Sequence, residues 1–416
     1  MERVLRFLIS AMISRGCLEV ETASGARFTA GDGSLEKVGV RFTDRAAQVA
    51  FLLDPALKLG ELFMEGRFEV TRGTIYDLLA LASINLARIE ELFSVRVLRW
   101  LRVAARCLGQ KNNKRNARRN VAHHYDLDRR LYALFLDADM QYSCAYFEHE
   151  DDTLDTAQLA KKRHIAAKLL LDAGDRVLDI GCGWGGMALY LARICGAKVT
   201  GVTLSEEQLA VANQRAAEAG FSGAAEFRLQ DYRDVSERYD RVVSVGMFEH
   251  VGVGFYDAFF QKIAHLLTED GVALLHTIGS AATPGPTNPW ITKYIFPGGY
   301  IPTLSEIMPA VERAGLFVTD IEVLSLHYAR TLRAWRERFM ARRDEARSLY
   351  DERFCRMWEF YLSGSESSFR YESHVVFQIQ LAKKLDAVPS TRAYIGAREA
   401  DLRRHEQTAS ALRIVR

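Results

Sequence analysis

From about residue 160 onward, short apolar runs alternate with amphipathic runs at a nearly regular interval. "DRVLDI" and "AKVTGVTL" have the composition of buried strands, and the segments that follow them, "WGGMALYLARIC" and "SEEQLAVANQRAAEA", have helical spacing. Three more apolar runs, "AEFRLQ", "YDRVVSVG" and "GVALLHTIG", continue the series. Strands that alternate with helices form a parallel sheet with helices on both faces. The alternation therefore predicts an α/β fold with a doubly wound sheet.

The first 90 or so residues do not follow this alternation. "KVGVRFTD" has the two-residue period of a strand, and "GTIYDLLALASINLARIEELF" has helical spacing. A chain of 416 residues also exceeds the usual size of one domain. We predict a smaller mixed α+β domain over residues 1–95, a basic amphipathic helix and linker over 96–120, and a catalytic domain with a polar, helix-compatible C-terminal tail over 121–416.

The predicted helix and linker are strongly basic. Nine Lys or Arg residues and no acid lie between Phe93 and Asn120, and the arginines at 96, 99, 102 and 106 share one side of a helix. Such a helix suits an anionic lipid surface, where each cation contributes about 1 kcal/mol. A solvated helix face beside a linker explains the pattern as well. RNA binding is disfavoured because aromatic residues are not interleaved with the charges, and the formal net charge of the chain is only +2.

The cysteines and the apolar runs indicate a compartment. Six cysteines are scattered along the chain without a C-x-x-C pair, which argues against a zinc ribbon and favours a reducing environment. No apolar window approaches the roughly 20 residues of a membrane span. We expect a cytoplasmic protein that touches a membrane from one side.

A glycine-rich loop follows the first strand of the predicted sheet. "VLDIGCGWGG" places glycines at 181, 183, 185 and 186, where they let the backbone approach a ligand closely. The loop satisfies G-x-G-x-x-G, but a nicotinamide site needs an acid about 20 residues further on. Thr203, Leu204 and Ser205 stand there instead, so the dinucleotide interpretation weakens. Together with Asp179 the loop resembles motif I of the class I S-adenosylmethionine-dependent methyltransferases.

Six long stretches agree with one family in order and spacing. They are "HYDLDRRLYALFLDADMQYSCAYF" at 124–147, "GCGWGG" at 181–186, "SVGMFEHVG" at 244–252, "LLHTIGS" at 274–280, "NPWITKYIFPGGYIPTL" at 288–304 and "HYARTLRAW" at 327–335. Together they resemble the cyclopropane-fatty-acyl-phospholipid synthases and the related mycolic acid cyclopropane synthases, over roughly residues 40 to 385. "DPALKLGELFMEGRFEV" is also similar to the N-terminal, lipid-carrier-like domain of the phospholipid-acting branch.

This resemblance implies a class I S-adenosylmethionine-dependent methyltransferase fold and a lipid-modifying reaction. The family transfers a methylene group from S-adenosylmethionine to the cis double bond of an unsaturated phospholipid acyl chain and forms a cyclopropane ring. An alkene is a weak nucleophile without an acidic proton, so a base is needed only after its attack, when the new methyl group must lose a proton. Such a site should be dry and lined by aromatic rings. A phospholipid bilayer is the implied partner, with a homodimer possible and no nucleic acid.

The resemblance also assigns residues. The family uses bound bicarbonate as the base, and its holders by motif position are Cys144, Glu249, His276, the backbone of Ile278, and Tyr328. A backbone N–H, an imidazole and a phenol can donate to an anion, and Glu249 would accept the bicarbonate hydroxyl. The matching positions for S-adenosylmethionine are Tyr142, Ser143, Gly181, Cys182, Gly183, Thr203, Leu204, Ser205, Gln208, Asp231 and Tyr232. No metal ligand is implied.

Alternatives remain at the level of single residues and of the reaction. Taken alone, His276 could be a hydrogen-bonded core histidine, and Tyr328 and Cys144 could be core residues. The same scaffold could make methyl-branched lipids or N-methylate a small amine. A non-enzymatic lipid-binding protein with an inactive fold would require damage in the site, and the motifs contain none.

Overall fold

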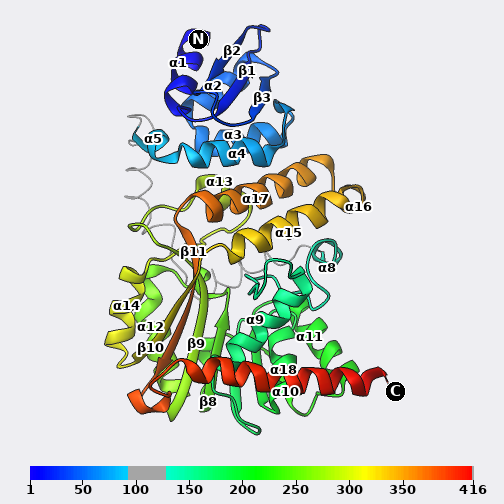
Figure 1. Cartoon of the computed structure of the whole chain (residues 1–416), viewed down its shortest axis with the longest axis vertical. Coiled ribbons are helices and arrows are strands. Elements are labelled where there is room, and N and C mark those ends of the chain that lie inside the picture. The colour runs from blue at the N-terminus through cyan, green and yellow to red at the C-terminus, as the bar shows by residue number, and fades with distance from the viewer. Residues whose placement is uncertain (92–127, 415–416) are drawn as a thin grey trace. The chain divides into compact units, whose positions relative to one another are not determined.

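The computed structural model describes residues 1–91 and 128–414, and Figure 1 shows their helices and strands. The described residues form two compact units. One comprises residues 128–284, 298–327 and 375–414, and the other comprises residues 1–91, 285–297 and 328–374. The predicted boundaries near residues 95 and 120, and the predicted basic helix between them, lie outside the described residues. The three-part division therefore stays a prediction.

The larger unit is built on a seven-stranded sheet with the order β10-β11-β9-β8-β5-β6-β7. Its strands are β5 (Arg176–Ile180), β6 (Lys198–Thr203), β7 (Ala225–Leu229), β8 (Tyr239–Val245), β9 (Leu267–Ser280), β10 (Phe317–Leu324) and β11 (His374–Ala382). The strands from β9 through β7 pair in parallel, and β10 pairs antiparallel with β11. The predicted α/β class with a mostly parallel, doubly wound sheet is confirmed. Ligands of such folds bind at the carboxyl ends of the parallel strands.

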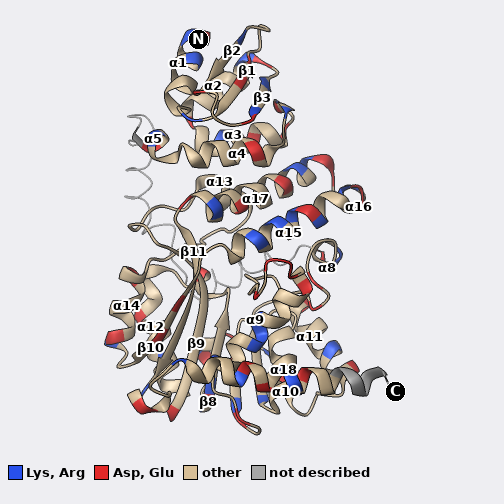
Figure 2. Ribbon diagram, in the orientation of Figure 1, with Lys and Arg blue, Asp and Glu red and all other residues tan. Residues whose placement is uncertain are grey.

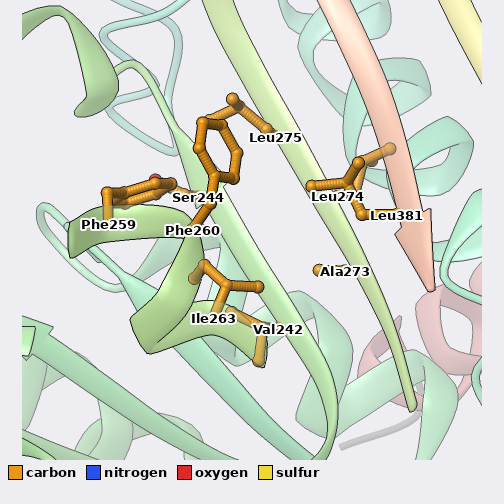
Figure 3. Close-up of a pocket in the computed structure, with 9 residues that line it drawn as sticks. All are labelled: Val242, Ser244, Phe259, Phe260, Ile263, Ala273, Leu274, Leu275 and Leu381. Atoms are coloured by element: carbon orange, nitrogen blue, oxygen red, sulfur yellow. The ribbon is translucent and has the colours of Figure 1, made fainter. Parts of the chain in front are cut away.

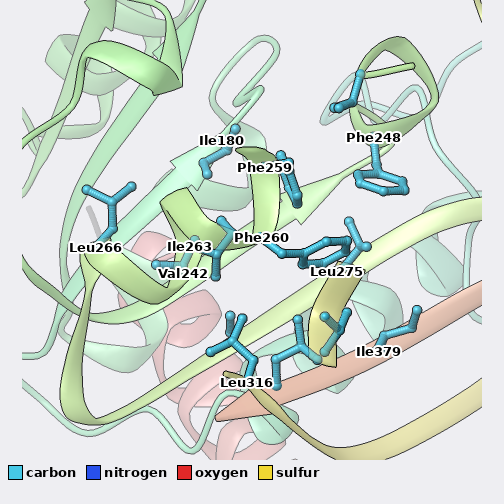
Figure 4. Packing of buried hydrophobic residues seen from close by; sticks show 14 of the residues in the cluster. Ile180, Val242, Phe248, Phe259, Phe260, Ile263, Leu266, Leu275, Leu316 and Ile379 are labelled. Carbon is cyan, nitrogen blue, oxygen red and sulfur yellow. The ribbon is translucent and has the colours of Figure 1, made fainter. Parts of the chain in front are cut away.

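Helices cover both faces of this sheet. One face packs against α9 (Leu154–Lys168), α10 (Gly186–Cys195) and α11 (Glu206–Ala219), and the other against α12 (Tyr256–Leu266) and α14 (Leu304–Arg313). Figure 4 shows the second face, where Phe259, Phe260 and Ile263 of α12 meet strand residues such as Val242 and Leu275. Burying one such side chain contributes about 1.5–3 kcal/mol. This packing holds the strand ends in place.

A small cavity remains in that packing. Figure 3 shows it between α12, β8 and β9, with Ser244 among otherwise apolar neighbours. Its volume is about 10 Å³, close to the minimum that a single water molecule needs. The Ser244 hydroxyl is buried and has no hydrogen-bond partner among the described residues. The cavity is a packing defect and is far too small for an acyl chain.

The polar C-terminal tail forms a long helix of the larger unit, α18 (Ala393–Ile414), which lies along α9 and α10 in Figure 1. Both ring nitrogens of buried His164 on α9 are bonded to carboxylates, Nδ1 to Glu399 of α18 at 2.6 Å and Nε2 to Glu322 at 2.7 Å. Burial disfavours the charged ring, but the two carboxylates outweigh it and raise the pKa of His164. Glu406 of α18 lies 3.4 Å from the guanidinium of buried Arg163. The tail is thus held by buried charges together with a few apolar contacts, such as those of buried Ile395.

The smaller unit contains a four-stranded mixed sheet with the order β2-β1-β3-β4. Its strands are β1 (Cys17–Glu21), β2 (Arg27–Ala30), β3 (Lys37–Phe42) and β4 (Phe68–Arg72). Its N-terminal helices are α1 (Glu2–Met12), α2 (Arg45–Leu53), α3 (Pro55–Met64), α4 (Ile75–Ile84) and α5 (Leu86–Glu91). The predicted mixed α+β character of this part is confirmed.

Two later stretches of chain complete this unit. They form α13 (Pro289–Tyr294), α15 (His327–Ala341), α16 (Arg343–Leu349) and α17 (Glu352–Tyr371), and α17 packs on α3 and α4. A Cβ on Gly60 of α3 would lie 2.4 Å from the Trp290 ring nitrogen, so α13 and α3 approach closely. Lys293 Nζ lies 2.5 Å from Glu61 Oε1, and Ser83 Oγ donates to Glu372 Oε1 at 2.7 Å. Figure 2 shows acids and bases interspersed along α15, α16 and α17.

Among the described residues, no helix is both long enough and apolar enough to cross a bilayer.

Candidate active site

The glycine loop leaves the carboxyl end of β5 in a left-handed conformation. Gly181 has φ +80° and Gly183 has φ +55°, a region that favours glycine. The Gly181 N–H donates to the Val202 carbonyl at 2.9 Å, which fastens the loop to β6. A Cβ on Gly181 would lie 2.9 Å from Met247, whereas a Cβ on Gly183 would meet open space. The loop therefore leaves room for a ligand against its backbone, as predicted for the cofactor.

The end of β6 carries a buried, neutral polar cluster. The Thr203 hydroxyl donates to Gln208 Oε1 at 2.9 Å and accepts from the Ser205 N–H at 3.2 Å. Ser205 Oγ in turn accepts the Gln208 N–H at the start of α11. Leu204 is half-buried. These four predicted residues lie together beside the glycine loop, where Cys182 is buried and its N–H donates to Val202 at 3.1 Å.

Asp231 and Tyr232 follow β7 and adjoin this cluster, because the Gln230 N–H donates to the Thr203 carbonyl at 3.1 Å. The Asp231 carboxylate is bound by the Arg233 guanidinium, with Oδ2 and Nη2 2.6 Å apart. The Tyr232 ring packs edge-on against Phe259. Both residues have the predicted position, and their contact with the cofactor stays a prediction.

The segment around residues 139–144 lies against the glycine loop. A Cβ on Gly186 would lie only 2.3 Å from Gln141 Nε2. Arg215 connects the two parts, since it donates to the Trp184 carbonyl at 2.8 Å and forms an ion pair with Asp139. Tyr142 meets Tyr132 edge-on at 5.3 Å between ring centres. The predicted Tyr142 and Ser143 are therefore brought to the predicted loop, although about 40 residues separate them in sequence.

Ser143 also approaches the end of β8. A Cβ built on Gly246 would lie 3.8 Å from Ser143 Cβ, and the Gly246 N–H donates to the His276 carbonyl at 2.9 Å. Cys144, the next residue, is 1% exposed, and its thiol donates to the Ala145 carbonyl at 3.2 Å. Cys144 and His276, two of the residues predicted to hold the anion, thus lie near the predicted cofactor residues.

Glu249 is a buried acid of this region. It lies in the short helix η2 (Phe248–His250), and its Oε1 accepts the Ile278 N–H at 2.6 Å. Its Oε2 is buried and has no hydrogen-bond partner among the described residues. Burial raises the pKa of Glu249 to about 7, against the opposing effect of hydrogen bonds from backbone N–H groups, including that of Ile278. The Ile278 N–H was predicted to donate to an anion, but in this structure it donates to Glu249.

His276 lies two residues before Ile278 on β9 and is 2% exposed. Burial, together with the positive charge of Lys161, holds the pKa of His276 well below its ordinary value, so the ring is neutral. Gln378 Nε2 lies 3.2 Å from His276 Nδ1. With the amide nitrogen as donor, Nδ1 is the acceptor and Nε2 keeps its hydrogen. The ring is thereby prepared to donate a hydrogen bond from Nε2.

Tyr328 differs from the other predicted pocket residues because it belongs to the smaller unit. It is 7% exposed and packs against Trp335 and Phe369, with ring centres 5.8 and 4.7 Å away. Its predicted role toward the anion stays a prediction.

Two buried residues of the site were missed in the sequence. Gln378 lies in the apolar strand "HVVFQIQLA", and Lys161 lies on a helix whose charges suggested an exposed face. A polar residue inside an apolar strand was an available signal for Gln378. No comparable signal marked Lys161.

Comparison with known proteins decides the family. The chain matches the family described as mycolic acid cyclopropane synthetase over residues 112–379, which is more than half of its length. The chain belongs to this family. The predicted family and the predicted enzyme class, an S-adenosylmethionine-dependent methyltransferase, are confirmed.

Individual members of the family are similar over most of the chain. The cyclopropane-fatty-acyl-phospholipid synthase of Escherichia coli (strain K12) is 39% identical over 335 residues, which are 80% of this chain and 85% of that protein. The tuberculostearic acid methyltransferase UfaA1 of Mycobacterium tuberculosis is 39% identical over 341 residues, 78% of each chain. The structure of the mycolic acid cyclopropane synthase CmaA1 complexed with SAH and CTAB is 35% identical, with a TM-score of 0.61, and covers 64% of this chain and 97% of that chain.

Proposed function

We propose that this protein transfers a methylene group from S-adenosylmethionine to the cis double bond of an unsaturated phospholipid acyl chain, with bound bicarbonate as the base. The similarity to the E. coli phospholipid synthase supports the phospholipid as substrate, because it extends over more of this chain than the family match does. The CmaA1 complex with SAH supports the cofactor.

The observation that carries the proposal is the environment of Glu249. One carboxylate oxygen is fixed by the Ile278 N–H at 2.6 Å, and the other is buried without a partner among the described residues. A buried carboxylate with an unused oxygen is prepared to accept a hydrogen bond from a ligand hydroxyl. His276, two residues from Ile278, is a neutral donor on the same strand. An acceptor beside a donor suits bicarbonate, which carries both an O–H and a negatively charged oxygen pair.

The residues divide the chemical work between them. When bound, S-adenosylmethionine supplies the methyl group and bicarbonate supplies the base. Glu249 would hold the bicarbonate hydroxyl and raise its basicity, and His276 would orient the anion. Burial of these groups excludes water, which would otherwise trap the cation formed after the alkene attacks. The open space at Gly183 and the neutral cluster at Thr203 would hold the cofactor.

The protein must also reach a bilayer to find this substrate. We propose peripheral association with the cytoplasmic membrane surface through the basic residues between 96 and 119, which lie outside the described residues. Assembly into a homodimer is part of the same proposal.

The decisive experiment incubates the purified protein with S-adenosylmethionine and unilamellar vesicles of a dioleoyl phospholipid. Mass spectrometry should show acyl chains that have gained one CH2, and the product should resist mild catalytic hydrogenation, because a cyclopropane has no double bond. Dipalmitoyl vesicles are the matched control and should remain unmodified. Methylation of small amines in place of any lipid would refute the proposal.

The UfaA1 relative favours one second candidate, because a methyltransferase that is not described as a cyclopropane synthase is equally identical to this chain. In that case a 1,2-hydride shift would move the cation to the methyl-bearing carbon, and loss of a methyl proton would leave a methylene branch of the same mass as the cyclopropane. Such a product keeps a double bond and would take up hydrogen in the same test.

A further inference from the structure

Lys161 of α9 is fully buried, with 0% of its surface exposed. Its amino group donates to Gln141 Oε1 at 2.7 Å and to Ser143 Oγ at 2.8 Å. Both acceptors are neutral, and Lys161 forms no ion pair among the described residues. Lys168, equally buried on the same helix, contacts Glu322 and lies 3.3 Å from Asp320. A buried ammonium without an anion costs several kcal/mol, so the Lys161 environment lacks a negative partner that the Lys168 environment has.

This amino group stands between the two halves of the candidate site. Ser143, its acceptor, belongs to the predicted cofactor residues, and Cys144 belongs to the predicted anion pocket. Burial raises the pKa of Asp179, near the end of β5, to about 7, and the charge of Lys161 opposes this rise. The same charge contributes to the low pKa of His276 on β9. Because the charge of Lys161 acts on residues of both β5 and β9, Lys161 lies close to a ligand that binds between the ends of these strands.

We propose that Lys161 is a positioning residue of this active site: it orients the Ser143 hydroxyl and provides the positive charge beside which a carboxylate-type anion binds. This inference rests on the proposed function. Two ligands of that function share the required chemistry, namely the α-carboxylate of S-adenosylmethionine and bicarbonate. Each presents a planar pair of oxygens that share one negative charge.

The hydrogen bond from Lys161 gives Ser143 a defined direction. Because the Ser143 oxygen accepts from an ammonium, its own hydrogen remains available to donate. A hydroxyl polarised in this way is a stronger donor to an anion. The second acceptor, Gln141, touches the glycine loop at Gly186, so the same amino group fixes the segment against the loop.

The protonation of Lys161 should respond to the ligand. Burial, together with the charge of Lys162, lowers the pKa of Lys161 to about 7. The remaining charged or titratable groups that act on it are Asp137, Asp139 and Cys144, which oppose this effect, and Asp179 and His276 on the neighbouring strands. A bound anion stabilises the ammonium, so the pKa rises on binding. Above pH 7 the protein should therefore take up a proton with the anion, and well below pH 7 it should not.

Calorimetry on the unaltered protein tests this directly. S-Adenosylhomocysteine, 5′-methylthioadenosine and sodium bicarbonate are each titrated at pH 8 in two buffers of different ionisation enthalpy. Methylthioadenosine is the matched ligand because it lacks the amino-acid portion. We expect uptake of about one proton with S-adenosylhomocysteine or with bicarbonate and none with methylthioadenosine. The ligand whose proton uptake is lost in Lys161→Met identifies the anion beside Lys161.

Two variants separate this role from a merely structural one. Lys161→Met keeps the length of the side chain and removes the charge, and it should weaken binding of that anion on the order of 10-fold or more. Its affinity for methylthioadenosine should change much less, and the proton uptake should vanish. Lys168→Met removes an equally buried lysine of the same helix. It should leave unchanged the affinity for that anion relative to the affinity for methylthioadenosine. If Lys161→Met does not fold, Lys161→Gln, which also removes the charge, replaces it in the same measurements.

The inference is overturned if neither S-adenosylhomocysteine nor bicarbonate draws a proton at pH 8, or if Lys161→Met folds and binds both with unchanged affinity. Failure of the proposed function looks different. In that case the unaltered protein would bind neither S-adenosylhomocysteine nor methylthioadenosine, or it would leave lipid vesicles unmodified.

Discussion

The raised pKa of Glu249 predicts that its ionised carboxylate lowers the free energy of unfolding. The carboxyl titrates near 7 in the folded protein and near its ordinary 4.5 when exposed, because burial disfavours its charged form. At about 1.4 kcal/mol for each pH unit, this difference amounts to about 3 kcal/mol. The folded state holds its proton more tightly than the unfolded state. The contribution of Glu249 to the free energy of unfolding should therefore be most favourable below pH 4.5, fall by that amount as the pH rises toward 7, and then level off.

Glu249→Gln should remove this dependence. Glutamine keeps the shape and the acceptor for the Ile278 N–H but cannot ionise. The free energy of unfolding of the variant, minus that of the unaltered protein, should thus rise by about 3 kcal/mol between pH 4.5 and pH 8. A constant cost from burying the amide N–H groups cancels in this comparison. At the same time, methylene transfer should fall on the order of 100-fold or more, because the partner of the base is lost.

Urea unfolding curves of both proteins, measured in steps across that pH range, give the difference directly. Glu322→Gln is the control with the opposite sign. Although Glu322 is partly buried, His164 and Lys168 hold its pKa well below the ordinary value, so its stabilising effect is present at pH 8 and is lost only in acid. A difference for Glu249→Gln that stays flat from pH 4.5 to pH 8 would refute the reasoning, as would full catalytic activity.

Three further predictions follow from other parts of the molecule. Gln378→Leu should lower activity about 10- to 100-fold by releasing the His276 ring, while the affinity for S-adenosylhomocysteine is retained. Gln380→Leu, on the same strand, is the control, and equal rates for the two variants would contradict the prediction. Deleting residues 393–416 should destabilise the larger unit by about 3–5 kcal/mol, because buried His164 and Arg163 lose carboxylate partners; an unchanged melting temperature would show that α18 is dispensable. Replacing four basic residues by glutamine should weaken binding to anionic vesicles, most visibly at low salt where the Debye length exceeds about 10 Å, and leave cofactor affinity unchanged; vesicle binding equal to that of the unaltered protein would restore the linker interpretation. The four residues are Lys114, Arg115, Arg118 and Arg119.

The sheet of the larger unit could be predicted because its information is local. Each strand is a short apolar run, and each helix begins at an identifiable residue, such as Ser205 ahead of α11. The glycine loop was equally predictable, because Gly181 and Gly183 adopt left-handed backbone angles that favour glycine. Residues grouped by family motif, such as Glu249 and Ile278, are also neighbours in the structure.

The missed features depend on contacts between distant residues. Lys161 has the sequence signature of a solvated helix, and only its contacts with the 141–143 segment show that it is buried. The tail lacks an apolar stripe, so its attachment through buried charges left no periodic signal. The inclusion of residues 328–374 in the unit that holds the N-terminal elements also left no signal in their composition.

That discontinuous unit constrains how the protein forms during synthesis. The N-terminal sheet and helices emerge first, yet the partners of Gly60, Glu61 and Ser83 are Trp290, Lys293 and Glu372, more than 200 residues later. Domains generally fold as units while the chain grows at about 5–20 residues per second. The first 91 residues must therefore wait some tens of seconds, with the α3 and α4 surfaces uncovered, until α17 has been made. A ribosome that stalls before α17 would release a chain whose N-terminal part is a target for chaperones and proteases.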